Sequence, residues 1–239
     1  MKRATCVVSA VVALLCATGV VQATTSYNLG ELIAEGGKVE VGDKIFSEFS
    51  YVAVGNMPPA ANVNVVPLRA GIDSTYNGIQ FQGGFFDLVD VGSQLSSDAL
   101  ISYTVEVNTD VAPGNIISDA HLEANPDLFG DSQGFVIITE SFQGLNGVVL
   151  GVGATNLPGE APFSKTIDWV DFDIADQITR LRVTKDIQML ALPGQNGRVP
   201  LLSFVDQTFS QVPEPASVAL LVSGLAGLGL FAARRRRGQ

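Results

Sequence analysis

The sequence predicts an all-β fold, a single antiparallel β-sandwich or jelly-roll-like domain. Short runs of alternating apolar and polar residues recur along the body of the chain, and β-branched and aromatic residues dominate them. Gly, Pro, Asn and Asp punctuate the gaps between these runs. No segment of the body has a helical stripe of apolar residues longer than about three turns, which disfavours a parallel βαβ architecture.

The N-terminal segment has the pattern of a signal peptide spanning residues 1–23. Lys2 and Arg3 form a positive start, and the stretch Ala4–Val21 that follows carries no charge. Small residues then occupy the positions that signal peptidase reads, which predicts cleavage after Ala23. The alternative, an uncleaved membrane anchor, is disfavoured because the small-residue site and a polar segment follow directly.

Roughly ten strands are expected between the two apolar ends. They are Phe46–Val54, Val63–Val66, Ile79–Gln82, Leu100–Val107, Phe135–Thr139, Val148–Val152, Ile167–Phe172, Ile178–Thr184, Ile187–Leu192 and Leu201–Val205. Asn77-Gly78 and Asn196-Gly197 are dipeptides typical of tight hairpin turns. Neither a fixed-period repeat nor a long linker is visible, so the sequence predicts one domain over residues 24–211.

The charge of this body differs from that of the whole chain. The chain has a formal net charge of −10, but residues 24–211 contain 8 basic and 23 acidic side chains, a formal charge of −15. An acidic body makes nucleic acid a poor partner. Cys6 and Cys16 both lie in the signal peptide, so the body has no cysteine and must be stabilised by its core or by bound ions.

The C-terminal segment has the pattern of a membrane-spanning helix. Ala216–Ala233 is an uncharged run of 18 residues. As a helix it would be about 27 Å long, close to the thickness of a bilayer's hydrocarbon core. A basic cluster follows at Arg234, Arg235, Arg236 and Arg237. The positive-inside rule places this cluster in the cytoplasm and therefore the body outside.

Val212-Pro213-Glu214-Pro215, the apolar run and the arginine cluster together closely resemble the PEP-CTERM sorting signal, over residues 212–239. The resemblance implies a Gram-negative envelope protein processed by an exosortase, a membrane cysteine transpeptidase. It also implies that Pro213, Glu214 and Pro215 are the recognition residues. Proteins with this signal typically come from bacteria that build extracellular polysaccharide. A plain single-pass anchor would explain the helix and the arginines, but not the Pro-Glu-Pro sequence.

The body carries no recognisable catalytic motif, and we expect no enzyme. It has no cysteine nucleophile, and His121 is the only histidine of the chain. His121 lies in a strand-like or turn segment, where a surface or hydrogen-bonded structural role is expected. A histidine-based zinc site is excluded by this composition. Paired carboxylates could cleave glycosides, but among 23 acidic residues some pair will always look suitable.

Two sequence features leave alternatives open. Asp168, Asp171, Asp173 and Asp176 concentrate four carboxylates, which suit either a calcium site or a solvated acidic edge. Four aromatic residues are candidates for stacking on sugar rings, although core packing is the usual role of an aromatic residue in a strand. These are Trp169, Tyr51, Tyr76 and Tyr103.

The combined expectation is an exported protein with a non-catalytic structural or adhesive β domain. Its precursor is anchored in the inner membrane with the body in the periplasm, and the sorted protein reaches the cell surface or the extracellular matrix. The expected partners are signal peptidase, an exosortase, the membrane through the C-terminal helix, and extracellular polysaccharide, a link that comes only from the resemblance. No cofactor is expected apart from the calcium alternative. A carbohydrate-binding or carbohydrate-cleaving module and a calcium-dependent adhesive domain remain the alternatives.

Overall fold

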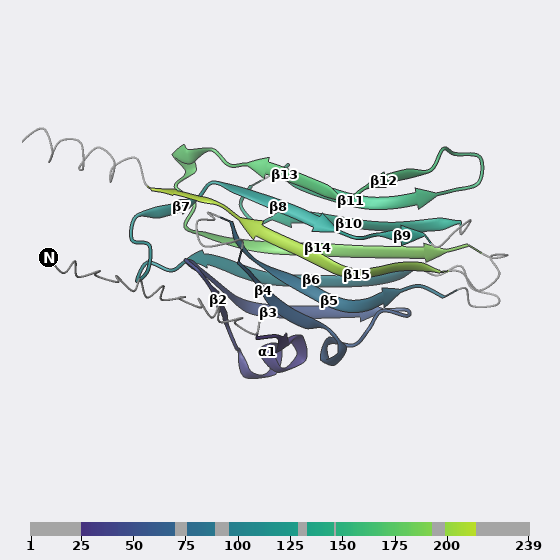
Figure 1. Cartoon of the computed structure of the whole chain (residues 1–239), viewed down its shortest axis with the longest axis horizontal. Coiled ribbons are helices and arrows are strands. Elements are labelled where there is room, and N and C mark those ends of the chain that lie inside the picture. Colours follow the sequence, from purple (N-terminus) through teal and green to yellow (C-terminus); the bar gives the residue numbers. More distant parts are fainter. Residues whose placement is uncertain are drawn as a thin grey trace, which may run out of the picture.

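A computed structural model describes residues 25–69, 76–88, 96–128, 133–145, 147–192 and 199–213 of the chain. The predicted signal peptide with Ala23, the predicted membrane helix 216–233 and the arginine cluster 234–237 lie outside these described residues. Within them the chain folds as an antiparallel β-sandwich, which confirms the predicted all-β class (Figure 1).

The elements follow one another along the chain with little helix between them. The strands are β1 (Tyr27–Asn28), β2 (Val39–Val41), β3 (Lys44–Val54), β4 (Asn64–Arg69), β5 (Asn77–Phe86), β6 (Ser97–Val107), β7 (Asn115–Ile117), β8 (Asp119–Ala124), β9 (Asp127–Leu128), β10 (Gly134–Phe142), β11 (Val149–Asn156), β12 (Phe163–Lys165), β13 (Ile167–Asp171), β14 (Arg180–Ala191), β15 (Pro200–Phe209) and β16 (Gln211–Pro213). The helical elements are α1 (Leu29–Glu35) and two single 3₁₀ turns, η1 (Ala60–Asn62) and η2 (Ile174–Asp176).

The strands of the described residues form two large sheets and one small ribbon. Sheet A has the order β1-β4-β5-β15-β8-β13, with β9 also paired to β15. Sheet B has the order β12-β11-β10-β14-β6-β3-β2, and β16 pairs with β7 in the ribbon. Figure 1 shows the strands running along the long axis of the molecule, with α1 beside β3. The strand order of sheet A places β15, late in the sequence, between β5 and β8.

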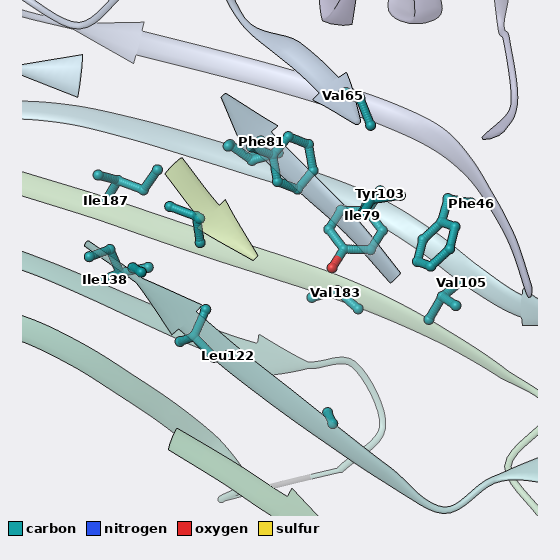
Figure 2. Close-up of a cluster of buried hydrophobic side chains, with 14 of the residues drawn as sticks. Phe46, Val65, Ile79, Phe81, Tyr103, Val105, Leu122, Ile138, Val183 and Ile187 are labelled. Atoms are coloured by element: carbon teal, nitrogen blue, oxygen red, sulfur yellow. The ribbon is translucent and has the colours of Figure 1, made fainter. Parts of the chain in front are cut away.

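The core lies between the two sheets, and alternation along each strand decides which residues enter it. On β8, Ala120, Leu122 and Ala124 are buried, while the residues that alternate with them face outward. Tyr103 of β6 is completely buried and packs against Phe81 of sheet A, with ring centroids 5.6 Å apart (Figure 2). Burying an aromatic side chain of this size contributes about 3 kcal/mol at most. The many buried side chains therefore stabilise a body that has no disulfide.

One strand is longer than the sequence predicts. Ile178–Thr184 and Ile187–Leu192 were expected as separate strands, but β14 runs without a break from Arg180 to Ala191. Two charged residues, Lys185 and Asp186, lie between the two predicted runs. In the structure, Lys185 points into the core, where its ammonium group donates to the carboxylate of Glu140 and to the side-chain oxygen of Gln207. With both partners present, the charge does not interrupt the strand.

The hairpin predicted at Asn77-Gly78 is wrong, because both residues begin β5 and pair with β15. Asn77 is buried and donates to Oδ1 of Asp43 at 2.7 Å. A Cβ atom on Gly78 would lie 1.9 Å from the carbonyl oxygen of Gln207. The close approach of β15, rather than a turn, therefore requires glycine at this position.

A buried lysine holds the last described segment against the body. Lys44 is completely buried, and its ammonium group donates to Asp43 at 2.8 Å and to the side-chain oxygen of Gln211. Burial lowers the pKa of Lys44, and the hydrogen bond to Asp43 opposes this shift. Gln211 then begins β16 opposite Ile117 of β7. The folded body therefore extends to Pro213, two residues beyond the predicted domain boundary.

Candidate functional site

The outer face of sheet A gathers aromatic and acidic side chains on adjacent strands. On β8 the buried alanines and leucine leave Asp119, His121 and Glu123 facing outward. The neighbouring strands β13 and β15 add outward residues in the same way. We call this surface the aromatic–acidic face, defined by Tyr76, Gln80, Asp119, His121, Glu123, Trp169, Asp171 and Asp206.

An aromatic row crosses the middle of this face. Trp169 on β13 lies directly opposite His121 on β8, and its side chain is 60% exposed. The ring of Tyr76 contacts the His121 ring edge-on, with centroids 5.1 Å apart and an interplanar angle of 89°. Nε2 of His121 lies 3.4 Å from Oδ1 of Asp119. These contacts orient the imidazole ring and leave the tryptophan open to solvent.

Acidic pairs lie on both sides of the aromatic row. Glu123 on β8 is directly opposite Asp206 on β15, and Asp119 on β8 is directly opposite Asp171 on β13. Each pair is two residues along the strand from the aromatic row, which corresponds to roughly 7 Å. The Glu123–Asp206 row continues onto β5, where Gln80 faces Asp206.

The environment of Asp206 is unusual for a surface carboxylate. Burial raises the pKa of Asp206 to about 6, and the negative charge of Glu123 adds to this effect. A hydrogen bond from Gln80 and the charge of Lys185 oppose it. Among the described residues, Oδ1 of Asp206 has no hydrogen-bond partner. This oxygen is itself buried and keeps an unused acceptor position beside the face.

Such a face can bind a flat molecule that has both an apolar surface and polar groups at its rim. An exposed indole offers a large, rigid apolar surface for stacking. Carboxylates and amides beside it can accept and donate hydrogen bonds in fixed directions. Sugar rings have this combination, with C–H groups on their faces and hydroxyl groups around the edge.

The same geometry is poorly suited to glycoside hydrolysis. Catalytic carboxyl groups flank the bond that they cleave, one on each side of the substrate. Glu123 and Asp206 instead sit opposite each other in the register of one sheet and point out of the same face. A sugar lying on this face would meet both carboxyl groups from one side. The arrangement therefore suits binding.

The sequence singled out four aromatic residues, and the structure separates them into two classes. Tyr103 is completely buried in the core, as expected for an aromatic residue in a strand. Tyr51 is half-buried and donates its hydroxyl to the carbonyl of Pro58 at 2.7 Å; burial raises its pKa to about 12. Trp169 and Tyr76 are exposed, and both contribute to the aromatic–acidic face.

The four aspartates of the calcium alternative have different surroundings. Oδ2 of Asp168 accepts the backbone N–H of Gly151 at 2.9 Å, and Oδ1 lies 2.8 Å from the ammonium group of Lys165. Asp171 ends β13 and belongs to the aromatic–acidic face. Asp173 caps η2 through a 2.9 Å bond from the N–H of Ala175, and Asp176 lies within that turn. Among the described residues, no three acidic, histidine or cysteine side chains form a group that could hold a metal.

The sequence located Trp169 and Tyr76 but did not connect them with His121, Glu123 and Asp206. The alternation in Asp119–Ala124, with apolar residues between polar ones, was the available signal for a strand with one polar face. The pairing of β8 with both β13 and β15 brings the residues together. Such long-range pairing cannot be deduced from local alternation.

The C-terminal segment lies largely outside the described residues. Pro213 ends β16, whereas Glu214, Pro215 and the four arginines are not described. In the described part of the chain, no helix has the length and apolar character needed to span a bilayer.

A model of the PEP-CTERM protein-sorting motif matches residues 211–237. The chain carries a PEP-CTERM motif. The resemblance seen in the sequence is thereby confirmed, and the motif marks an exported protein that an exosortase processes at the envelope of a Gram-negative bacterium. The match begins at Gln211, so the first residues of the PEP-CTERM motif are also β16 of the folded body.

No curated protein matches the chain. Among solved structures, the chain is similar to TmCBM61 in complex with β-1,4-galactotriose, with 13% sequence identity and a TM-score of 0.27. The similarity covers 65% of this chain and 86% of that chain.

Proposed function

We propose that this protein is an exported, exosortase-sorted envelope or matrix protein whose β-sandwich binds extracellular polysaccharide without cleaving it. The observation that carries the proposal is the exposed Trp169 opposite His121, with Tyr76 against the same imidazole. A tryptophan in an alternating strand normally enters the core, where its apolar surface is removed from water. Here the indole faces solvent beside hydrogen-bonding side chains, which is the composition of a sugar-binding surface.

The sorting motif supports the location of this activity. In the proposed route, the precursor is held in the inner membrane with its body in the periplasm until the exosortase acts at Pro213-Glu214-Pro215. The sorted protein then contributes adhesion at the cell surface or in the extracellular matrix. Binding to polysaccharide in that layer gives the sorted body a role that needs no catalytic residue and no cofactor.

Trp169 provides a direct test, because it is the only tryptophan of the chain. The purified full chain is titrated with a panel of neutral, amino and acidic oligosaccharides in a zwitterionic detergent, since a sugar-based detergent would compete for the face. We expect at least one glycan to shift the emission of Trp169 to shorter wavelengths and to protect it from acrylamide. Calorimetry then compares Trp169→Ala, which should lose binding, with Phe163→Ala as a control.

Phe163 is the matched control because it is an aromatic residue on β12, 54% exposed, outside the aromatic–acidic face. Binding that survives Trp169→Ala, or no binding to any glycan of the panel, would overturn the proposal. Sugar released from the bound glycan would instead show that the protein is a hydrolase.

A further inference from the structure

The aromatic–acidic face is built from two pairs of like charges placed directly opposite each other. These are Glu123 with Asp206 and Asp119 with Asp171. Like charges at directly opposed positions of an antiparallel sheet destabilise it. Here two such pairs lie beside an exposed aromatic row, so charge repulsion opposes the pairing of the strands. Local features that oppose the stability of the fold are expected at functional sites.

Little on the protein itself neutralises these carboxylates. Within the described ranges, none of the four forms an ion pair with a lysine or an arginine. Asp119 has partial compensation from His121 and from the backbone N–H of Ser210, which donates to it at 2.9 Å. Asp206 has partial compensation from a hydrogen bond from Gln80 and from the charge of the buried Lys185, while its Oδ1 is unpartnered among the described residues. The face is complementary to a ligand that supplies positive charge.

The geometry identifies the kind of cation that fits. Calcium takes six to eight oxygen ligands, whereas each row of this face offers two carboxylates. An organic ammonium group needs only one or two acceptors. The row of Trp169 and His121 lies roughly 7 Å from either acidic pair, so a sugar ring stacked on the indole could place a ring substituent at a carboxylate.

We propose that the aromatic–acidic face binds a polysaccharide with free amino groups, such as a partly deacetylated hexosamine polymer. This inference rests on the proposed function and names its ligand class. The formal charge of −15 on residues 24–211 also attracts a cationic polymer and repels an acidic one. Asp206 and Glu123 bind the ammonium groups, while Trp169 binds the ring.

The test compares two oligosaccharides that differ only in whether their amino groups are free or acetylated. The full chain is titrated slightly below neutral pH, where glucosamine amines are protonated to a substantial extent, with oligomers of β-1,4-linked glucosamine and with N-acetylglucosamine oligomers of the same length. We expect the free-amine oligomer to bind about tenfold more tightly at low salt. Because partly exposed charges are screened, this preference should shrink as the salt concentration rises.

A double variant removes the contribution of charge and leaves the stacking residue Trp169 in place. Glu123→Gln combined with Asp206→Asn should bring the affinity ratio close to one while binding of the acetylated oligomer remains. Asp98→Asn is the matched control, because burial and the neighbouring Asp186 raise the pKa of Asp98 to about 6 as well, yet Asp98 lies on β6 in sheet B. That control should leave both affinities unchanged.

The outcomes distinguish this inference from the proposed function. Equal affinity for the two oligomers, or tighter binding of an acidic glycan, would overturn the amino-sugar inference and leave polysaccharide binding intact. A failure of every glycan to bind would overturn both.

Discussion

Glu140 on β10 lies directly opposite Lys185 on β14, and both side chains are completely buried between the two sheets. Lys185 also donates to Gln207 of β15, so this lysine joins sheet B to sheet A. Burial raises the pKa of Glu140 and lowers that of Lys185, while the charge of each residue opposes the shift of the other. A charged pair in a core is costly to assemble and more costly to break.

This pair gives a prediction about stability. Lys185→Met leaves Glu140 buried without its cation and should lower the free energy of unfolding by about 3–5 kcal/mol. Adding Glu140→Leu removes the stranded carboxylate and should restore most of the loss. Urea denaturation followed by circular dichroism measures both. A double variant as unstable as Lys185→Met alone would show that the ion pair is not the source of the effect.

The raised pKa values of Asp98 and Asp206, each about 6 against the ordinary 3.8, predict an unusual pH dependence. The folded protein holds protons near pH 6 that the unfolded chain releases near pH 4. The melting temperature should therefore rise as the pH falls from 8 to 5. Asp206→Asn should raise the melting temperature at pH 8 and change it little at pH 5. An equal effect at both pH values would contradict the protonation argument.

Asp206→Asn thus links stability with binding. We expect the variant to be more stable at pH 8, because it removes a like-charge pair, and to lose its preference for amino sugars. A residue whose replacement stabilises the fold but impairs binding is typical of a functional site.

Two glycines of β5 should respond in opposite ways to the same change. Gly78→Ala places Cβ 1.9 Å from a backbone carbonyl oxygen of β15, which cannot move without disturbing the sheet. We expect a loss of about 3 kcal/mol. Gly84→Ala meets no atom within 4 Å and should be neutral or slightly stabilising. Thermal melts of both variants test this contrast, which would be contradicted if Gly78→Ala melted like the unmodified chain.

The calcium alternative predicts a response to chelation that the observed contacts do not favour. Asp168 is bound to Lys165 and to the backbone of Gly151, and Asp173 caps a turn. We expect EDTA to leave the melting temperature unchanged in a calcium-containing buffer. A fall of several degrees, restored by added calcium, would instead establish a calcium-dependent fold.

The sorting residues predict an effect on processing. In a host with an exosortase, replacing Pro213, Glu214 and Pro215 together by alanine should leave unprocessed protein in the membrane fraction. Pro158→Ala with Glu160→Ala is the control, because these residues occupy an exposed loop of the body. Immunoblots of membrane and medium fractions measure size and location. Unchanged size and location in the triple variant would contradict recognition at this sequence.

The parts of the fold that local alternation could predict are those in which one face of a strand is apolar. Leu100–Val107 and Phe135–Thr139 were recognised because their inward residues are apolar, and both lie within strands of sheet B. Local alternation divides β14 into two predicted strands, because a lysine such as Lys185 is normally solvated. Its buried partner, Glu140 on β10, is known only from the structure. Asn77-Gly78 looked like a turn because the neighbouring strand that requires the glycine comes 130 residues later, at Gln207 to Thr208.

The candidate site could be predicted only in part for the same reason. An exposed tryptophan and a core tryptophan have the same local pattern, and Trp169 was distinguished only by the strand order that makes β13 an edge of sheet A. Glu123 and Asp206 are 83 residues apart in the sequence, and their proximity depends on the register between β8 and β15. The presence of the sorting motif was predictable because its residues are contiguous.

The position of β15 determines how the protein responds to a pulling force. This strand lies between β5 and β8, and the chain leaves it through Ser210 into the motif-bearing segment. In the proposed tethered precursor, a pull on the C-terminal segment would load the β16–β7 ribbon first. It would then act along β15, a central strand, perpendicular to the hydrogen bonds that join this strand to both neighbours. Those bonds share the load and must break together rather than one after another. The aromatic–acidic face on β8 and β13 is joined to β15 within the same sheet. If this face binds polysaccharide as proposed, tension between the polysaccharide and the C-terminal segment would cross sheet A without passing through the core.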